Sequence, residues 1–155
     1  GLVGSEMCIR DSNIITWNQE IEQERKSAVF DLLNNGKFKL FNKEETGPYK
    51  LNIKLLEWKL ILDIHDLYDE TNIEIKLSIS GVRRIIRDYQ IVCDNYVEAI
   101  KTAPLKKIEA IDIGRRTIHD EGAETLLNFF KDTVELDMDT ARRLFTLISI
   151  ISIKI

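Results

Sequence analysis

Apolar residues alternate with polar ones in three consecutive runs of the chain, at residues 49–55, 60–64 and 73–79. A period of two places successive side chains on opposite faces of a strand, so each run predicts a half-buried strand with one solvated face. The short connections between the runs, such as Glu57-Trp58, are typical of hairpins and therefore of antiparallel pairing.

A helical period marks other parts of the chain, where apolar residues recur every three or four positions. These stretches are residues 18–35, 82–100, 104–130 and a last one that begins at Asp137 or Asp139. A short strand is also predicted near residues 38–41. The order predicts an α+β domain with an N-terminal helix, an antiparallel four-stranded sheet, and then three helices packed on one face of that sheet.

The length of 155 residues suits one domain with one hydrophobic core. Residues 1–12 neither begin with methionine nor follow the layout of a signal peptide, so we interpret them as a non-native leader and residues 13–155 as a single globular domain. The apolar run at residues 144–155 is shorter than the roughly 20 residues that span a bilayer. With Cys93 as the one cysteine outside the leader, we expect a cytoplasmic protein without disulfides or a membrane partner.

Charged side chains interrupt the apolar face of the predicted helix at residues 104–130. Asp112, Arg115 and His119 fall on the same side of this helix as its isoleucines, and Arg116 lies at the edge of that side. Spacings of three and four residues let these side chains contact one another. Because a charge removed from water needs a partner, the cluster is either a structural ion-pair network or a binding site.

In the binding-site interpretation, Asp112 or Glu121 orients His119, which acts as a base or a ligand contact while an arginine of the cluster holds an anion. Two glycines support a special role for this stretch. Gly114 and Gly122 lie inside the predicted helix, where glycine is unfavourable. They therefore indicate either a close approach to the backbone or a break in the helix.

A second group of arginines begins the predicted helix at residues 82–100. Arg83, Arg84 and Arg87 lie in its first turns, where the helix dipole disfavours cations and favours anions. One interpretation is that carboxylates from another helix, such as Glu121, neutralise them. The other is that a phosphate, a nucleotide or a nucleic-acid backbone binds there.

The composition excludes several classes of function. A net charge of -4 makes the chain a poor match for strongly basic nucleic-acid-binding proteins, so any anion site must be local. The two histidines and Cys93 have no metal-ligand spacing, and the chain contains no glycine-rich phosphate loop. We therefore expect no metal and no cofactor.

Five segments of the sequence carry a resemblance to a known family. They are EIEQERKSAVFDLL, GPYKL, RRIIRDYQIVCDNYVEAI, IEAIDIGRRTIHDEG and ELDMDTARRLFTLI. Together they resemble the bacterial family that is catalogued as uncharacterised and numbered 0262 in the UPF series, over about residues 20–148. Family members read more like GRRGLHNEG in the fourth segment, so Thr117 and Asp120 depart from that pattern and weaken any role that needs an amide at position 120. The resemblance implies a small cytosolic bacterial protein and no particular activity.

Three hypotheses about function follow from these residues. The leading one is a binding or interaction module that holds an anionic small molecule, RNA or an acidic protein. The second is an enzyme that uses His119 as general base on an anionic substrate. The third is a structural homodimer with a buried ionic network and a seam of apolar residues from Leu144 to Ile151. The candidate ligand-binding residues are Arg83, Arg84, Arg87, Asp112, Arg115, Arg116, His119 and Glu121.

Overall fold

The computed structural model describes residues 2–10, 19–36, 38–40 and 48–152. The strands are β1 (Leu2–Arg10), β2 (Phe38–Leu40), β3 (Tyr49–Leu56), β4 (Lys59–Asp66), β5 (Thr71–Ser78) and β6 (Val134–Leu136). The helices are α1 (Gln19–Asn35), α2 (Arg83–Thr102), which a short 3-10 turn at Ser80–Val82 precedes, α3 (Leu105–Phe130) and α4 (Met138–Ile151). The mixed α+β class predicted from the sequence is confirmed.

The three alternating runs form an antiparallel meander, as predicted. β3 pairs with β4, and β4 pairs with β5, so that Leu51 faces Ile64 and Leu62 faces Ile75 across the sheet. Glu57 and Trp58 make the two-residue turn between β3 and β4, both with positive φ, which matches the right-handed twist of a hairpin. Alternate residues of β3 and β4 are buried on one face, from Tyr49 to Leu55 and from Leu60 to Ile64.

The predicted antiparallel four-stranded sheet is wrong in its fourth strand. The main sheet has the order β1-β3-β4-β5, and β1 runs parallel to β3. β2 pairs instead with β6 in a separate two-stranded sheet. Each of these strands has three residues, too few for a periodic pattern to identify a partner so far along the chain.

The chain also does not start with a helix, because β1 precedes α1. β1 lies within residues 1–12, which the sequence analysis set aside as a leader, so the sheet that we predicted could not include it. The leader and the domain limits stay predictions.

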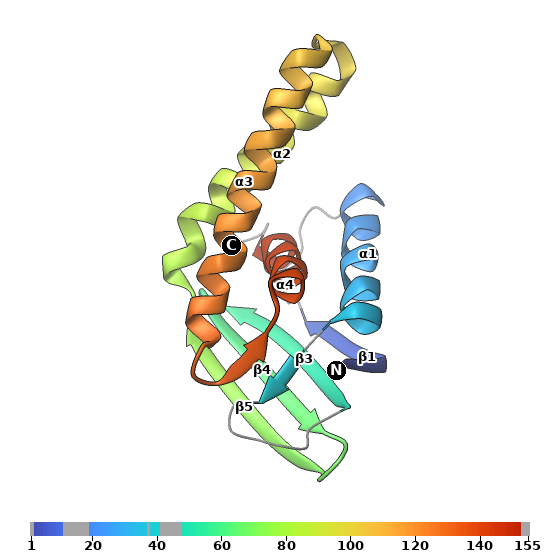
Figure 1. The fold of residues 1–155 in the computed structure, drawn as a ribbon, viewed down its shortest axis with the longest axis vertical. Coiled ribbons are helices and arrows are strands. Elements are labelled where there is room, and N and C mark those ends of the chain that lie inside the picture. Colours follow the sequence, from blue (N-terminus) through green and yellow to red (C-terminus); the bar gives the residue numbers. More distant parts are fainter. Residues whose placement is uncertain (1, 11–18, 37, 41–47, 153–155) are drawn as a thin grey trace.

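The helices cover the apolar face of the sheet (Figure 1). α4 lies between α1 and α3 and contacts both, while α2 and α3 form a long antiparallel hairpin. The side chains of α4 that we predicted as a homodimer seam are buried in the domain: Leu144, Phe145, Leu147, Ile148 and Ile151 are at most 3% exposed. The prediction that these side chains form a homodimer seam is therefore wrong, since α4 is a core helix of the domain.

The distal half of the α2–α3 hairpin projects beyond the rest of the molecule (Figure 1), and we call it the arm. The predicted continuous apolar face of α3 is buried in its lower half, at Ala123, Leu126 and Phe130. In the arm, Leu105 and Ile113 are 69% and 65% exposed. Helical periodicity identified the helix but not how far it extends past the core.

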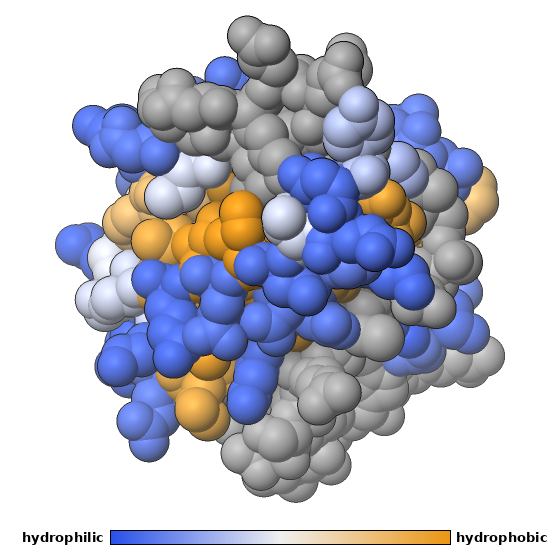
Figure 2. Space-filling view, turned by 90° about the horizontal axis from the view of Figure 1, so that it is seen from below, coloured by the Kyte–Doolittle hydropathy of each residue, from blue (hydrophilic) through white to orange (hydrophobic). Residues whose placement is uncertain are grey.

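The opposite face of the sheet is polar. Lys50, Asn52, Asp63, His65 and Glu74 line a shallow hollow there, and hydrophilic residues spread over much of the surface seen from this end (Figure 2). Within the described residues, no helix is both long and apolar enough to cross a membrane.

Candidate functional site: a cleft lined by arginines

Four helices line an open cavity of about 450 Å³ at the base of the arm. Its lining residues are Glu24 of α1, Tyr89 of α2, Arg115, Arg116, His119 and Asp120 of α3, and Arg142, Arg143 and Thr146 of α4. We call this cavity the arginine cleft. Its volume lies within the usual range of about 300–1,000 Å³ for small-molecule sites.

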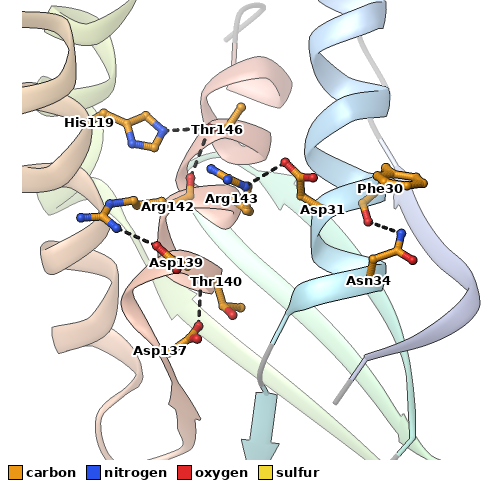
Figure 3. A network of polar contacts seen from close by, with 10 residues as sticks. All are labelled: Phe30, Asp31, Asn34, His119, Asp137, Asp139, Thr140, Arg142, Arg143 and Thr146. Carbon is orange, nitrogen blue, oxygen red and sulfur yellow. Dashed lines mark hydrogen bonds and ion pairs between the residues drawn. The ribbon is translucent and has the colours of Figure 1, made fainter.

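Local sequence explains why α3 and α4 approach so closely here. Asp137 begins α4, since its Oδ1 accepts a hydrogen bond from the backbone N–H of Thr140 at 2.9 Å (Figure 3). Gly122 of α3 faces the ring of Phe145, and a Cβ added at Gly122 would lie 2.5 Å from Cζ of that ring. The predicted close approach at Gly122 is confirmed. A Cβ added at Gly114 would have no neighbour within 4 Å, and α3 continues through this position without a break.

The predicted contacts within α3 form around Asp112. Its two carboxylate oxygens bind Arg115 Nη2 at 2.5 Å and Arg116 Nη2 at 2.6 Å. The hydrogen bond from Arg115 lowers the pKa of Asp112, so this carboxylate stays ionised. The Arg115 guanidinium also lies 4.8 Å from the ring centre of Tyr96, while the Arg116 side chain is 73% exposed.

The arginines of α4 connect helices. Arg142 binds Asp120 of α3 at 2.8 Å and Asp139 of its own helix at 2.7 Å. Arg143 binds Asp31 of α1 at 3.0 Å. Figure 3 shows the two guanidinium groups pointing in opposite directions from α4. Asp139 thus pairs with Arg142 and not with Arg143, although Arg143 lies four residues away on the same helix.

His119 is held between α3 and α4. Its Nε2 lies 2.8 Å from Thr146 Oγ1, and that hydroxyl donates to the backbone oxygen of Arg142 at 3.2 Å (Figure 3). A hydroxyl has one hydrogen, so this arrangement favours an imidazole whose Nε2 carries a hydrogen and donates it to Thr146. The rings of Tyr89 and Phe145 are each centred 5.2 Å from the imidazole.

Burial lowers the pKa of His119 to about 4, and the surrounding arginines act in the same direction, while Asp120 opposes them. The imidazole is therefore neutral at pH 7. Burial likewise raises the pKa of the Tyr89 hydroxyl and of the Cys93 thiol, so both groups keep their protons.

Glu24 closes the cleft on the side of α1. Partial desolvation raises the pKa of its carboxyl group, and the nearby positive charge of Arg115 partly offsets that effect. The residue as a whole is exposed to solvent. Glu24 makes no ion pair with any of the residues that the structure describes, which distinguishes it from Asp112 and Asp120.

The second predicted arginine group does not line the cleft. Arg83 lies over the Trp58 ring at 5.4 Å, and Arg84 is 92% exposed and 4.0 Å from Asp88. Arg87 and Glu121 are exposed and also lie outside the lining. Of the candidate residues, the structure brings together Asp112, Arg115, Arg116 and His119.

The residues that other helices bring to the cleft were not predicted from the sequence. Arg142 and Thr146 are four residues apart in α4, a spacing that puts two polar groups on one side of an otherwise apolar helix. That signal was present in the sequence. No comparable signal marks Glu24, which lies among several other carboxylates of α1. Within the described part of the chain, no group of residues is arranged to hold a metal ion.

Comparison with known proteins identifies related chains. The model of the uncharacterised protein family UPF0262 matches residues 5–154. A UPF0262 protein of Azorhizobium caulinodans is 43% identical over 139 residues, which are 89% of this chain and 86% of that relative. Relatives from Brucella canis and Ruegeria pomeroyi are each 40% identical, over 91% and 95% of this chain and 88% and 94% of their own lengths. No solved structure matches.

Proposed function

The chain belongs to the uncharacterised protein family UPF0262, and we propose that it is a binding protein that holds a small anionic group in the arginine cleft. One observation carries this proposal. Arg115 and Arg116 share the single carboxylate of Asp112, so this pair carries one positive charge in excess on the α3 side of a cavity of ligand size. Guanidinium groups bind carboxylates and phosphates through paired N–H donors.

The two arginine pairs have different roles in this proposal. Arg142 and Arg143 are paired with three carboxylates, those of Asp31, Asp120 and Asp139, so they connect helices and have no charge to spare. The anion therefore binds at the α3 pair, where Arg116 is accessible from solvent.

The chemistry of the cleft supports binding more than catalysis. His119 is neutral at pH 7, but a base with a pKa of about 4 is weak, and its Nε2 already has a partner in Thr146. The phenol of Tyr89 and the thiol of Cys93 are protonated and thus poor nucleophiles. The enzyme with His119 as general base is therefore the second candidate, and a cytoplasmic homodimer stays a prediction.

A thermal-shift titration tests the proposal, with inorganic phosphate and acetate as probes at low ionic strength. We expect the melting temperature to rise with ligand, because ligand that binds the folded state alone stabilises it. Arg116→Gln should remove the shift. Arg84→Gln, an exposed arginine outside the cleft, is the matched control and should retain it. If neither probe shifts the melting temperature at about 10 mM, a concentration far above most specific dissociation constants, anion binding in the cleft is refuted.

A further inference from the structure

We propose that the arginine cleft takes a zwitterion, a small molecule whose anionic group binds Arg115 and Arg116 and whose cationic nitrogen binds Glu24. This inference rests on the proposed function and names the class of ligand. An amino acid, with a carboxylate and an ammonium group, is the simplest member of that class.

The first argument is the position of Glu24. It lines the same cavity as Arg115 and Arg116, but from α1, and its carboxyl group is close enough to Arg115 and to the Tyr89 hydroxyl to interact electrostatically with both. A ligand in the cavity can therefore contact α1 and α3 at once. The two charged ends of a zwitterion fit these two sides.

The second argument is the pairing of the carboxylates. Asp31, Asp112, Asp120 and Asp139 each bind an arginine of the cleft. Glu24 lines the same cavity, is exposed, and has no such partner among the described residues. Its carboxylate is therefore available to a cation, and an ammonium group supplies three N–H donors.

The third argument is the sum of charges at the cavity. A plain anion would bring negative charge close to Glu24 and Asp120, and a plain cation would bring positive charge close to four arginines. A zwitterion adds no net charge and places each sign beside its opposite, which is the complementarity that gives specificity.

The size of the cavity agrees with this class. A volume of about 450 Å³ at the lower end of the usual range holds a molecule of amino-acid size. Tyr89, His119 and Thr146 also line the cavity, although His119 Nε2 and Thr146 Oγ1 bind each other. An RNA chain or a folded protein could insert only a single group into this space.

Isothermal titration calorimetry with a matched series of probes tests the proposal. In the first set, propionate is alanine without its ammonium group and ethylamine is alanine without its carboxylate. γ-Aminobutyrate, butyrate and propylamine repeat the comparison with a longer separation of charges. In the unmodified protein, at least one zwitterion should bind about tenfold more tightly than its anion, as expected for a charged hydrogen bond. The amines should not bind.

Variants then assign the preference to Glu24. In Glu24→Gln, the zwitterion should bind no more than about twofold more tightly than its anion, because the charged acceptor is gone. Glu124→Gln, an exposed carboxylate of α3 that does not line the cleft, is the control and should keep the full preference. Arg116→Gln should weaken anion and zwitterion alike. Circular dichroism of each variant establishes that it folds.

The outcomes separate this inference from the proposed function. If the anions bind and the zwitterions bind no more tightly, or if Glu24→Gln keeps the preference, the zwitterion is refuted and the anion site stands. If no anion and no zwitterion binds to the folded protein, both are refuted, and Glu24 acts as one more counter-charge for Arg115.

Discussion

Replacing Gly122 by alanine places a methyl group inside the ring of Phe145, at the closest approach of α3 and α4. Phe145 is fully buried, and its ring packs against those of Tyr89 and His119, with centres 5.4 and 5.2 Å away. The ring therefore has no empty space into which it can move. Overpacking of a core usually costs about 1–3 kcal/mol, and a direct overlap with a confined ring belongs at the upper end.

The gain in helix propensity from glycine to alanine is about 1 kcal/mol and offsets part of this cost. We therefore expect Gly122→Ala to lower the free energy of unfolding by about 2 kcal/mol. Gly114→Ala is the matched control in the same helix, because open space surrounds that position. At position 114 only the higher helix propensity of alanine changes the free energy of unfolding, and it should stabilise the protein by about 0.5–1 kcal/mol.

Urea denaturation followed by circular dichroism measures both changes from the shift of the midpoint at constant slope. The variant Phe145→Leu gives a second control, since a smaller side chain at the contact should make the Gly122→Ala change less costly in that background. If Gly122→Ala is as stable as Gly114→Ala, the close approach of α3 and α4 is not as described.

Three further predictions concern single side chains. Because the pKa of His119 is about 4 in the folded protein and about 6.5 in the unfolded chain, the unfolded chain binds the proton more readily, and stability should fall as pH drops from 6.5 to 4. The loss in the free energy of unfolding is at most about 3 kcal/mol, and roughly half of that after solvent screening. The urea midpoints at pH 7.5 and 4.5 should differ less in His119→Gln than in the unmodified protein. Equal differences in the two proteins would contradict this prediction. Asp137→Ala should cost about 1 kcal/mol through loss of the cap on α4, whereas the exposed Asp132→Ala should be neutral by the same assay. Arg143→Gln should cost less than about 1 kcal/mol in thermal unfolding, because its ion pair with Asp31 is partly exposed; a larger loss would show that this bridge is a major support of the fold.

The sequence predicted those parts of the fold that local periodicity determines. Alternation identified β3 and β4, where Leu51, Ile53 and Leu62 are buried as expected. The pairing of β2 with β6 could not be predicted, since two three-residue strands with three strands and two long helices between them in the sequence carry no pattern that matches them. The length of the arm was equally hidden, because Ile113 fits the helical pattern of α3 but lies beyond the core.

The candidate site was predictable to the extent that it lies on one helix. Asp112, Arg115 and His119 are spaced for mutual contact on α3, and the pair of Asp112 with Arg115 forms as predicted. Glu24 and Arg142 come from helices that precede and follow α3, so only tertiary packing brings them to the cleft. Arg83 was predicted to belong to the anion site because it lies in the first turn of α2. Its position in the sequence does not reveal that the guanidinium lies over the Trp58 ring.

The central position of α4 has a consequence for biosynthesis. This helix fills the space between α1, α3 and the sheet, yet the ribosome produces it after every other element that the structure describes. Until α4 leaves the exit tunnel, the apolar face of the sheet in the nascent chain stays exposed to solvent. Chaperones that shield such surfaces during translation would therefore find their target in this interval.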